Sequence, residues 1–282
     1  LRMPRALLVL ALVFAGVSAV SAGGNGGESG ASPWAGEAES RVRLIAAQTG
    51  VGDGKTLKLG FQFSLQPGWK IYWRSPGDAG LPPEFDWSGS ENLAATEVLW
   101  PAPKRYSAYG LDSIGYENEV ILPVVAELEF AGQPLNLKLR LDYLICKDVC
   151  IPRRADLALM LPKGPAGPTS YGQEIARYLE KVPGRGNSPD FGVESVEAIG
   201  SLDKPRLRVV ARSTVPFEET DVFIEGPRGN FFKGPELELY EGDSRAVFDV
   251  PLRRVGKARE ESLIGKTLTV TLVADGRVHT IG

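Results

Sequence analysis

The sequence predicts an all-β protein built from two consecutive antiparallel β-sandwiches, the second smaller than the first. Short segments in which apolar and polar residues alternate recur along most of the chain, and this period of two is typical of half-buried strands. Turn-forming clusters rich in glycine and proline separate these segments. Many short strands joined by such turns favour packed antiparallel sheets over a parallel sheet with crossover helices.

The N-terminal segment predicts that the chain is exported. Two arginines precede a continuous apolar run over residues 6–20, and the small residues Ser21 and Ala22 follow it. A basic start, a short apolar run and small residues before the cleavage point are typical of a secretory signal peptide, which we assign to residues 1–22. The run has about 15 residues, whereas a helix that spans a bilayer needs about 20. An uncleaved membrane anchor is the alternative. The glycine-rich start of residues 23–39 predicts a flexible arm.

The first sandwich is expected over residues 40–162. One clear strand is 56–65, where leucines and phenylalanines alternate with polar or small residues, and a longer one is 135–146, which alternates throughout. The run 119–128 is also apolar but contains Pro123. Because proline lacks the amide hydrogen that an interior strand donates, this residue predicts an edge strand or a bulge.

A change of composition separates the two sandwiches. Residues 163–189 are rich in proline and glycine and predict a linker, with a short helix within 169–182 that Thr169 or Ser170 would cap. Strand-like runs separated by turns resume within residues 190–282. About 90 residues with this pattern match the size of an immunoglobulin-like domain, so we expect a second, smaller immunoglobulin-like sandwich there.

Composition argues against two classes of partner. The chain has 32 basic and 35 acidic residues and a net charge of −3, without the basic face that a nucleic-acid partner requires. It has one histidine, His279, and two cysteines. A structural zinc ion needs four ligands, so we expect no metal and no other cofactor. Copper(I) bound by the two thiolates alone remains the alternative.

Both cysteines lie in one short stretch, YLICKDVCIP, at residues 143–152. A hairpin with the three-residue loop 147–149 would place Cys146 opposite Cys150, with both side chains on the face that the apolar residues leave free. Opposed Cα atoms in an antiparallel pair lie about 4.5–5.5 Å apart, and a disulfide spans about 4.4–6.8 Å. The spacing therefore permits a disulfide.

Such a pair has three readings. As a structural bond it would close a loop of only five residues, which contributes about 2 kcal/mol, less than a bond joining distant strands. As a ligand pair it would hold a soft metal. As a redox pair it would need no base or cofactor, because a thiolate attacks a partner disulfide and the neighbouring cysteine resolves the product.

Three motifs, in this order, carry a family resemblance: GWKIYWRSPGDAGLPPEFDW, WPAPKRYSAYGLDSIGYENEVILPV and YLICKDVCIP. Together they resemble the periplasmic N-terminal domain of the thiol:disulfide interchange protein DsbD, and most of all its ScsB-like relatives, which carry CxxxC and a second immunoglobulin-like module. The resemblance is strong over residues 40–162 and weak over 190–282.

The resemblance implies an immunoglobulin-like fold and a periplasmic thiol-disulfide oxidoreductase component. Such a domain takes electrons from a membrane-embedded electron transporter or a thioredoxin-like protein and passes them to exported disulfide proteins. The alternatives are a copper(I)-binding or copper-tolerance protein and a non-catalytic secreted binding module with a structural disulfide.

The resemblance also implies roles for single residues. Cys150 would meet the partner disulfide and Cys146 would resolve the mixed disulfide. A cap segment at 104–112 would shield the pair until a partner arrives. Its shielding residues would be two tyrosines and a flexible glycine, with one more aromatic residue beside the pair: Tyr106, Tyr109, Gly110 and Tyr72.

Overall fold

The computed structural model describes residues 29–185, 190–201, 203–259, 263 and 265–282. The predicted signal peptide and the first part of the predicted arm lie outside the described residues. Within them the protein is almost entirely β, with α1 (Gly172–Leu179) and the short 3-10 helix Gly256–Arg259 as exceptions. None of these described helices is long and apolar enough to cross a membrane.

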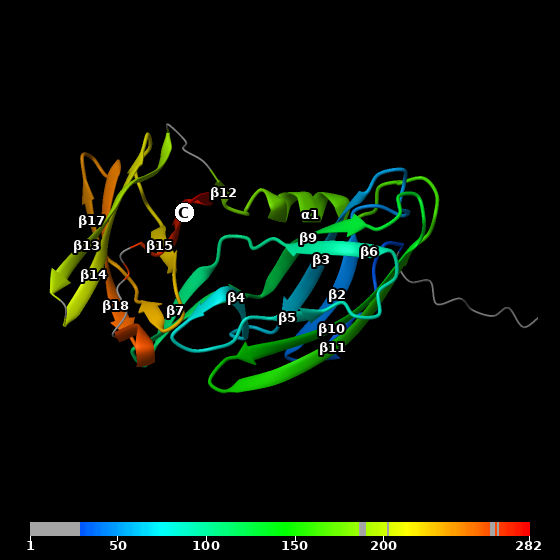
Figure 1. Cartoon of the computed structure of the whole chain (residues 1–282), viewed down its shortest axis with the longest axis horizontal. Helices are drawn as coiled ribbons and strands as arrows, with labels where there is room; N and C mark the ends of the chain where they lie inside the picture. Colours follow the sequence, from blue (N-terminus) through cyan, green and yellow to red (C-terminus); the bar gives the residue numbers. More distant parts are fainter. Residues whose placement is uncertain (1–28, 186–189, 202, 260–262, 264) are drawn as a thin grey trace, which may run out of the picture.

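Two antiparallel sheets form the first sandwich (Figure 1). The first sheet has the order β1-β2-β3-β9-β6 and the second has the order β11-β10-β4-β8-β7, with β5 also on β10. The strands are β1 (Ala35–Glu37), β2 (Ser40–Ala46), β3 (Thr56–Leu65), β4 (Lys70–Gly77), β5 (Glu84–Asp86), β6 (Leu93–Val98), β7 (Lys104–Ala108), β8 (Leu111–Glu117), β9 (Glu119–Leu128), β10 (Leu135–Cys146) and β11 (Cys150–Leu161).

Alternating residues of these strands fill the space between the two sheets, as the period of two predicts. Phe61 of β3, Trp73 of β4 and Leu141 of β10 are all fully buried there. The first sheet is also covered on its other face, because α1 packs on it (Figure 1). Ile175 of the helix joins a small apolar cluster with Ile121 of β9. Both faces of this sheet are therefore buried near its centre.

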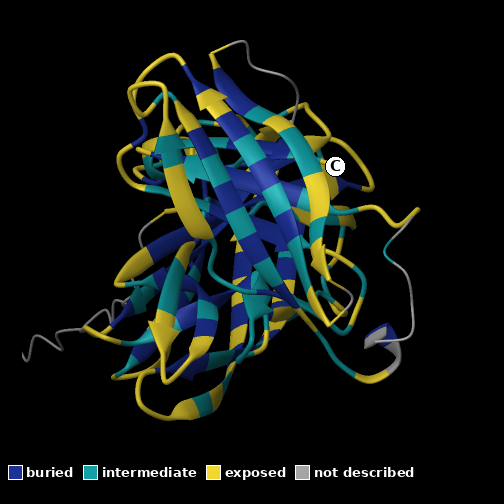
Figure 2. Ribbon diagram, turned by 90° about the vertical axis from the view of Figure 1, so that its left-hand side faces the viewer, coloured by how far each residue is buried: buried dark blue, intermediate teal, exposed yellow. Residues whose placement is uncertain are grey.

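The second sandwich also has two sheets, with the orders β12-β20-β19-β15 and β13-β14-β18-β16, and β17 added to β18. All its strand pairs in the described residues are antiparallel except β12 with β20. Figure 2 shows buried residues alternating with partly exposed ones along its long strands. The strands are β12 (Gly184–Arg185), β13 (Phe191–Ser201), β14 (Lys204–Ser213), β15 (Thr220–Glu225), β16 (Asn230–Phe232), β17 (Glu236–Tyr240), β18 (Arg245–Arg254), β19 (Thr269–Ala274) and β20 (Arg277–Ile281).

This architecture confirms the predicted fold class of two immunoglobulin-like antiparallel sandwiches, and three local features differ from the sequence-based expectation. Residues 35–37, inside the segment expected to be a flexible arm, form β1 and pair with β2. Trp34 holds this segment down, because the Arg43 guanidinium lies 4.4 Å from its ring centroid. The helix begins later than expected: its N-cap is Tyr171, which makes no side-chain capping bond. Thr169 instead accepts a hydrogen bond from the Tyr171 amide at 3.2 Å.

Pro123 is the third difference, because β9 lies between β3 and β6 and is not an edge strand. The Pro123 carbonyl accepts a hydrogen bond from the Leu99 amide at 2.7 Å, so the nitrogen of Pro123 faces the same side. The paired ladder between β6 and β9 stops at Val98 opposite Val124. The missing amide hydrogen therefore falls where the neighbouring strand has ended. The register shift between β6 and β9 lies at Leu93/Ala95, so the expectation of an edge or a bulge at Pro123 itself was wrong.

Candidate redox site

The two cysteines lie at the end of the longest hairpin of the first sandwich. Strands β10 and β11 pair without interruption from Leu135 opposite Leu161 to Cys146 opposite Cys150. Since the apolar residues of both strands face the core, this register places both sulfurs on the opposite face. Cys146 and Cys150 form a disulfide, with their Cα atoms 4.1 Å apart. The Lys147 amide donates to the Val149 carbonyl at 3.1 Å and closes the loop.

The two sulfurs differ in accessibility. Cys146 is only 4% exposed, because β4 continues the sheet beside it and pairs Lys70 with Cys146. Cys150 is exposed, because β11 is the outer strand of its sheet. The neighbouring Val149 is 63% exposed. A reacting molecule therefore meets Cys150 before Cys146.

Tyr72 lies beside the exposed sulfur. Its hydroxyl is 3.7 Å from the Cys150 Sγ, and since a disulfide sulfur carries no hydrogen, the tyrosine is the donor. The side chain is 1% exposed, and burial raises the pKa of Tyr72, so the hydroxyl stays protonated at neutral pH. Gly80 packs against the ring: a Cβ atom there would lie 2.2 Å from Cε1 of Tyr72.

The predicted cap segment, residues 104–112, forms β7, a turn and the start of β8. We call the complete hairpin of β7 and β8 (residues 104–117) the cap hairpin. Tyr109 and Gly110 form its turn, with φ of 53° and 74°, as a two-residue turn matching the twist of a β-ribbon requires. The Tyr109 side chain is 99% exposed and covers nothing in this arrangement. Shielding of Cys150 by this residue would require the hairpin to move, and it stays a prediction.

Tyr106 takes a different position from Tyr109. It lies on the body of the cap hairpin, and the Lys70 ammonium is 5.2 Å from its ring centroid. Burial, reinforced by the negative charge of Glu117, raises the pKa of Tyr106. Lys70 pairs with Cys146, so Tyr106 is connected to the disulfide through this lysine, although β4 and β8 lie between β7 and β10 in the sheet. The structure therefore brings Tyr72 to the pair, places Tyr106 nearby, and leaves Tyr109 and Gly110 at the tip.

Sequence reasoning missed two features of this site. Lys70 lies in register with Cys146, and the alternation of 68–73, with its apolar and polar faces, was the available signal for it. Gly80 lies in the glycine- and proline-rich stretch 75–83, which predicts a turn, and nothing in one sequence reveals that it contacts Tyr72. Elsewhere in the described residues, no group of three or more His, Cys, Asp or Glu side chains is arranged to hold a metal ion.

Residues 41–162 match the family model described as thiol:disulfide interchange protein DsbD, N-terminal. This part of the chain belongs to the DsbD N-terminal domain family. The disulfide, Tyr72 and the cap hairpin all lie within the matched residues of this DsbD N-terminal domain. Residues 181–281 match a domain of unknown function, DUF8393.

A solved structure shares the fold of both sandwiches. The N-terminal periplasmic domain of ScsB from Proteus mirabilis superposes with a TM-score of 0.71 and 22% sequence identity, over 90% of this chain and 97% of that one. This likeness extends the shared fold from the DsbD N-terminal domain into the second sandwich. None of the curated proteins compared with the chain matches it.

Proposed function

We propose that the Cys146–Cys150 pair is redox-active and that the protein relays electrons in the periplasm to exported disulfide proteins. In the reduced chain, the Cys150 thiolate attacks one sulfur of a partner disulfide and releases the other as a thiolate. The Cys146 thiolate then attacks the Cys150 sulfur and releases the partner's first sulfur. Two electrons pass to the partner, and the chain returns to the disulfide form.

The unequal exposure of the two sulfurs is the observation that carries this proposal. A sequential exchange needs one accessible sulfur to attack and a neighbouring one to resolve, and Cys150 is exposed while Cys146 is 4% exposed. Membership of residues 41–162 in a thiol:disulfide interchange family supports the same chemistry. A purely structural role explains less, because closing a five-residue loop contributes only about 2 kcal/mol.

Tyr72 supports the assignment of Cys150 as the attacking residue. A thiolate is the nucleophile in disulfide exchange, and a hydrogen bond to the charged form stabilises it. The protonated Tyr72 hydroxyl lies 3.7 Å from the Cys150 sulfur and can donate such a bond once the disulfide opens. This donor reaches Cys150, the exposed member of the pair.

The oxidised chain regains its two electrons from a donor dithiol by the same exchange chemistry. The proposed donors are a membrane-embedded electron transporter and a thioredoxin-like protein, each of which carries a reactive dithiol. Val149, which precedes Cys150, is exposed and offers a partner an apolar contact beside the disulfide. Three more large apolar side chains are exposed in the cap hairpin and in the loop that covers Tyr72: Leu81, Tyr109 and Leu111.

The proposal is tested by mixing the reduced chain with an oxidised thioredoxin-like periplasmic protein and counting thiols on each after alkylation. We expect two thiols to appear on the partner for each chain that becomes oxidised, and none with the variant in which both cysteines are serine. A chain that keeps its thiols while the partner stays oxidised, although the partner can be reduced by dithiothreitol, would contradict the proposed relay.

A further inference from the structure

The cap hairpin is attached to the second sandwich at its first strand. Arg105 of β7 donates from Nε and Nη2 to the Asp221 carboxylate of β15 at 2.9 and 3.3 Å. It also donates to the Val222 carbonyl at 2.9 Å, and its guanidinium lies 5.1 Å from the Phe223 ring centroid. The Arg105 side chain is only 11% exposed. This contact fixes the base of the hairpin to β15.

The second sandwich also holds the turn and the second strand of the cap hairpin. Lys233, just after β16, donates from Nζ to the carbonyl of Gly110 at 3.1 Å. The amide of Gly234 donates to Asp112 Oδ2 at 2.8 Å, and Ser107 donates to the other oxygen of that carboxylate. The turn and the start of β8 are therefore tied to residues 233 and 234.

Lys233 reaches the other segment beside the disulfide as well. It pairs with the carboxylate of Asp78, whose side chain is 2% exposed. The same carboxylate accepts hydrogen bonds from Arg253 of β18 at 3.0 Å and from the Asp112 amide at 2.9 Å. Asp78 lies two residues before Gly80, which packs on Tyr72. One lysine of the second sandwich thus links the cap hairpin to the loop that covers Tyr72.

We propose that the second sandwich is a positioning element for the redox site, and that Lys233 holds the cap hairpin in the open position in which Cys150 is exposed. This inference rests on the proposed function and gives the second sandwich a role in it. The observation behind it is that the anchored hairpin leaves both Tyr109 and Cys150 accessible. Without the anchor, the hairpin would exchange between open and covering positions.

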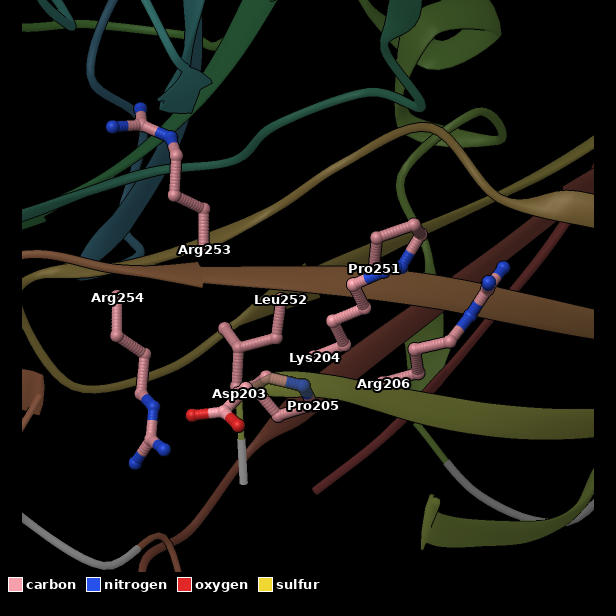
Figure 3. Close-up of a pocket in the computed structure, with 8 residues that line it drawn as sticks. All are labelled: Asp203, Lys204, Pro205, Arg206, Pro251, Leu252, Arg253 and Arg254. Carbon is pink, nitrogen blue, oxygen red and sulfur yellow. The ribbon is translucent and has the colours of Figure 1, made fainter. Parts of the chain in front are cut away.

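The second sandwich also has a cavity of about 640 Å³, which Arg253 helps to line (Figure 3). It is lined by several cations, but Arg253 is engaged with Asp78 and Arg206 with Glu236. Figure 3 shows Arg253 and Arg254 extending to opposite sides of their strand. The cavity therefore does not present converging cations to an anion, and the link through Lys233 carries the inference.

The test uses the full chain with Lys233→Met, which removes the ammonium and keeps the apolar stem. In the oxidised protein, amide hydrogen exchange over residues 104–112 should become about tenfold faster, since a charge-assisted hydrogen bond at the turn is lost. In the Cys146→Ser background, alkylation of Cys150 by iodoacetamide should become several-fold slower, because the freed hairpin covers the sulfur part of the time. Lys233→Arg, which keeps a donor, should restore both rates.

The matched control is Lys204→Met, which removes an exposed lysine of the same sandwich and should change neither rate. Unchanged exchange in Lys233→Met, or an equal change in Lys204→Met, would overturn the proposal. Faster exchange combined with unchanged or faster alkylation would overturn the open-holding role. Neither readout needs a redox partner, so a failure of the relay itself would appear separately, as a partner disulfide that the unmodified chain does not reduce.

Discussion

Replacing Arg105 with methionine should destabilise the contact between the two sandwiches far more than the same change at Arg74. Both arginines make two hydrogen bonds to a carboxylate of β15, Arg105 to Asp221 and Arg74 to Glu225. They differ in burial, because the side chain of Arg105 is 11% exposed and that of Arg74 is 34% exposed. Arg105 also donates to the Val222 carbonyl, so the comparison tests the effect of burial together with that one additional hydrogen bond.

The magnitude follows from what each variant leaves behind. Removing Arg105 strands the Asp221 carboxylate in a buried site, and breaking a buried pair costs about 3–5 kcal/mol; the partial exposure of Asp221 favours about 3 kcal/mol. The more exposed Arg74 pair should cost about 1 kcal/mol. For a protein of this size about 1 kcal/mol shifts the Tm by about 2–4 °C. We therefore expect Tm decreases of about 6–12 °C and about 2–4 °C.

The assay is thermal unfolding of the oxidised chain followed by circular dichroism at neutral pH and again at lower pH. Burial raises the pKa of Asp221 despite the neighbouring Arg105, and removing the arginine raises it further. A carboxyl with a raised folded-state pKa loses its contribution to stability as the pH rises through that pKa, so the deficit of Arg105→Met should shrink on acidification. Equal Tm decreases for the two variants, or a deficit that grows as the pH falls, would refute the reasoning.

Three further outcomes are expected. Tyr72→Phe should slow the alkylation of reduced Cys150 at neutral pH by about two- to tenfold, since one hydrogen bond to the thiolate is lost; an unchanged rate would remove the assigned donor. The control Gly110→Ala has open space around it but a positive φ, so it should cost about 1–2 kcal/mol in urea unfolding from backbone strain alone. Gly80→Ala shares a positive φ and its Cβ also meets the Tyr72 ring, so it should cost about 1–3 kcal/mol more than the control; equal costs would contradict this. Burial opposes ionisation of Asp78, yet the Asp112 amide, Lys233 and Arg253 lower its pKa. The free energy of unfolding should therefore fall as the pH drops below the ordinary carboxyl pKa. In unfolding titrations of Asp78→Asn, this decrease with pH should be less steep.

The hairpin that carries the cysteines could be predicted from the sequence because its determinants are local. The alternation of 135–146 fixes which face is buried, and a three-residue loop then leaves one register in which the apolar faces of both strands coincide. Cys146 opposite Cys150 follows from that register. The later start of the helix was not predictable in this way, because its position depends on how Ile175 packs against the first sheet.

The surroundings of the disulfide could not be predicted, since they depend on contacts between distant segments. Tyr72 reaches Cys150 only because β4 pairs with β10, and the alternation of a strand does not name its neighbour. Arg105 and Lys233 look like ordinary surface cations in the sequence. Their roles appear only when the second sandwich is placed against the cap hairpin.

The order of attack is the most direct test of the proposed relay. The reduced variants Cys146→Ser and Cys150→Ser are each mixed with an oxidised thioredoxin-like periplasmic protein, and the products are separated on non-reducing gels. Cys146→Ser should accumulate a mixed disulfide through the exposed Cys150, because the resolving thiol is absent. Cys150→Ser should accumulate little, because Cys146 is 4% exposed. Equal trapping by both variants, or stronger trapping by Cys150→Ser, would contradict the account.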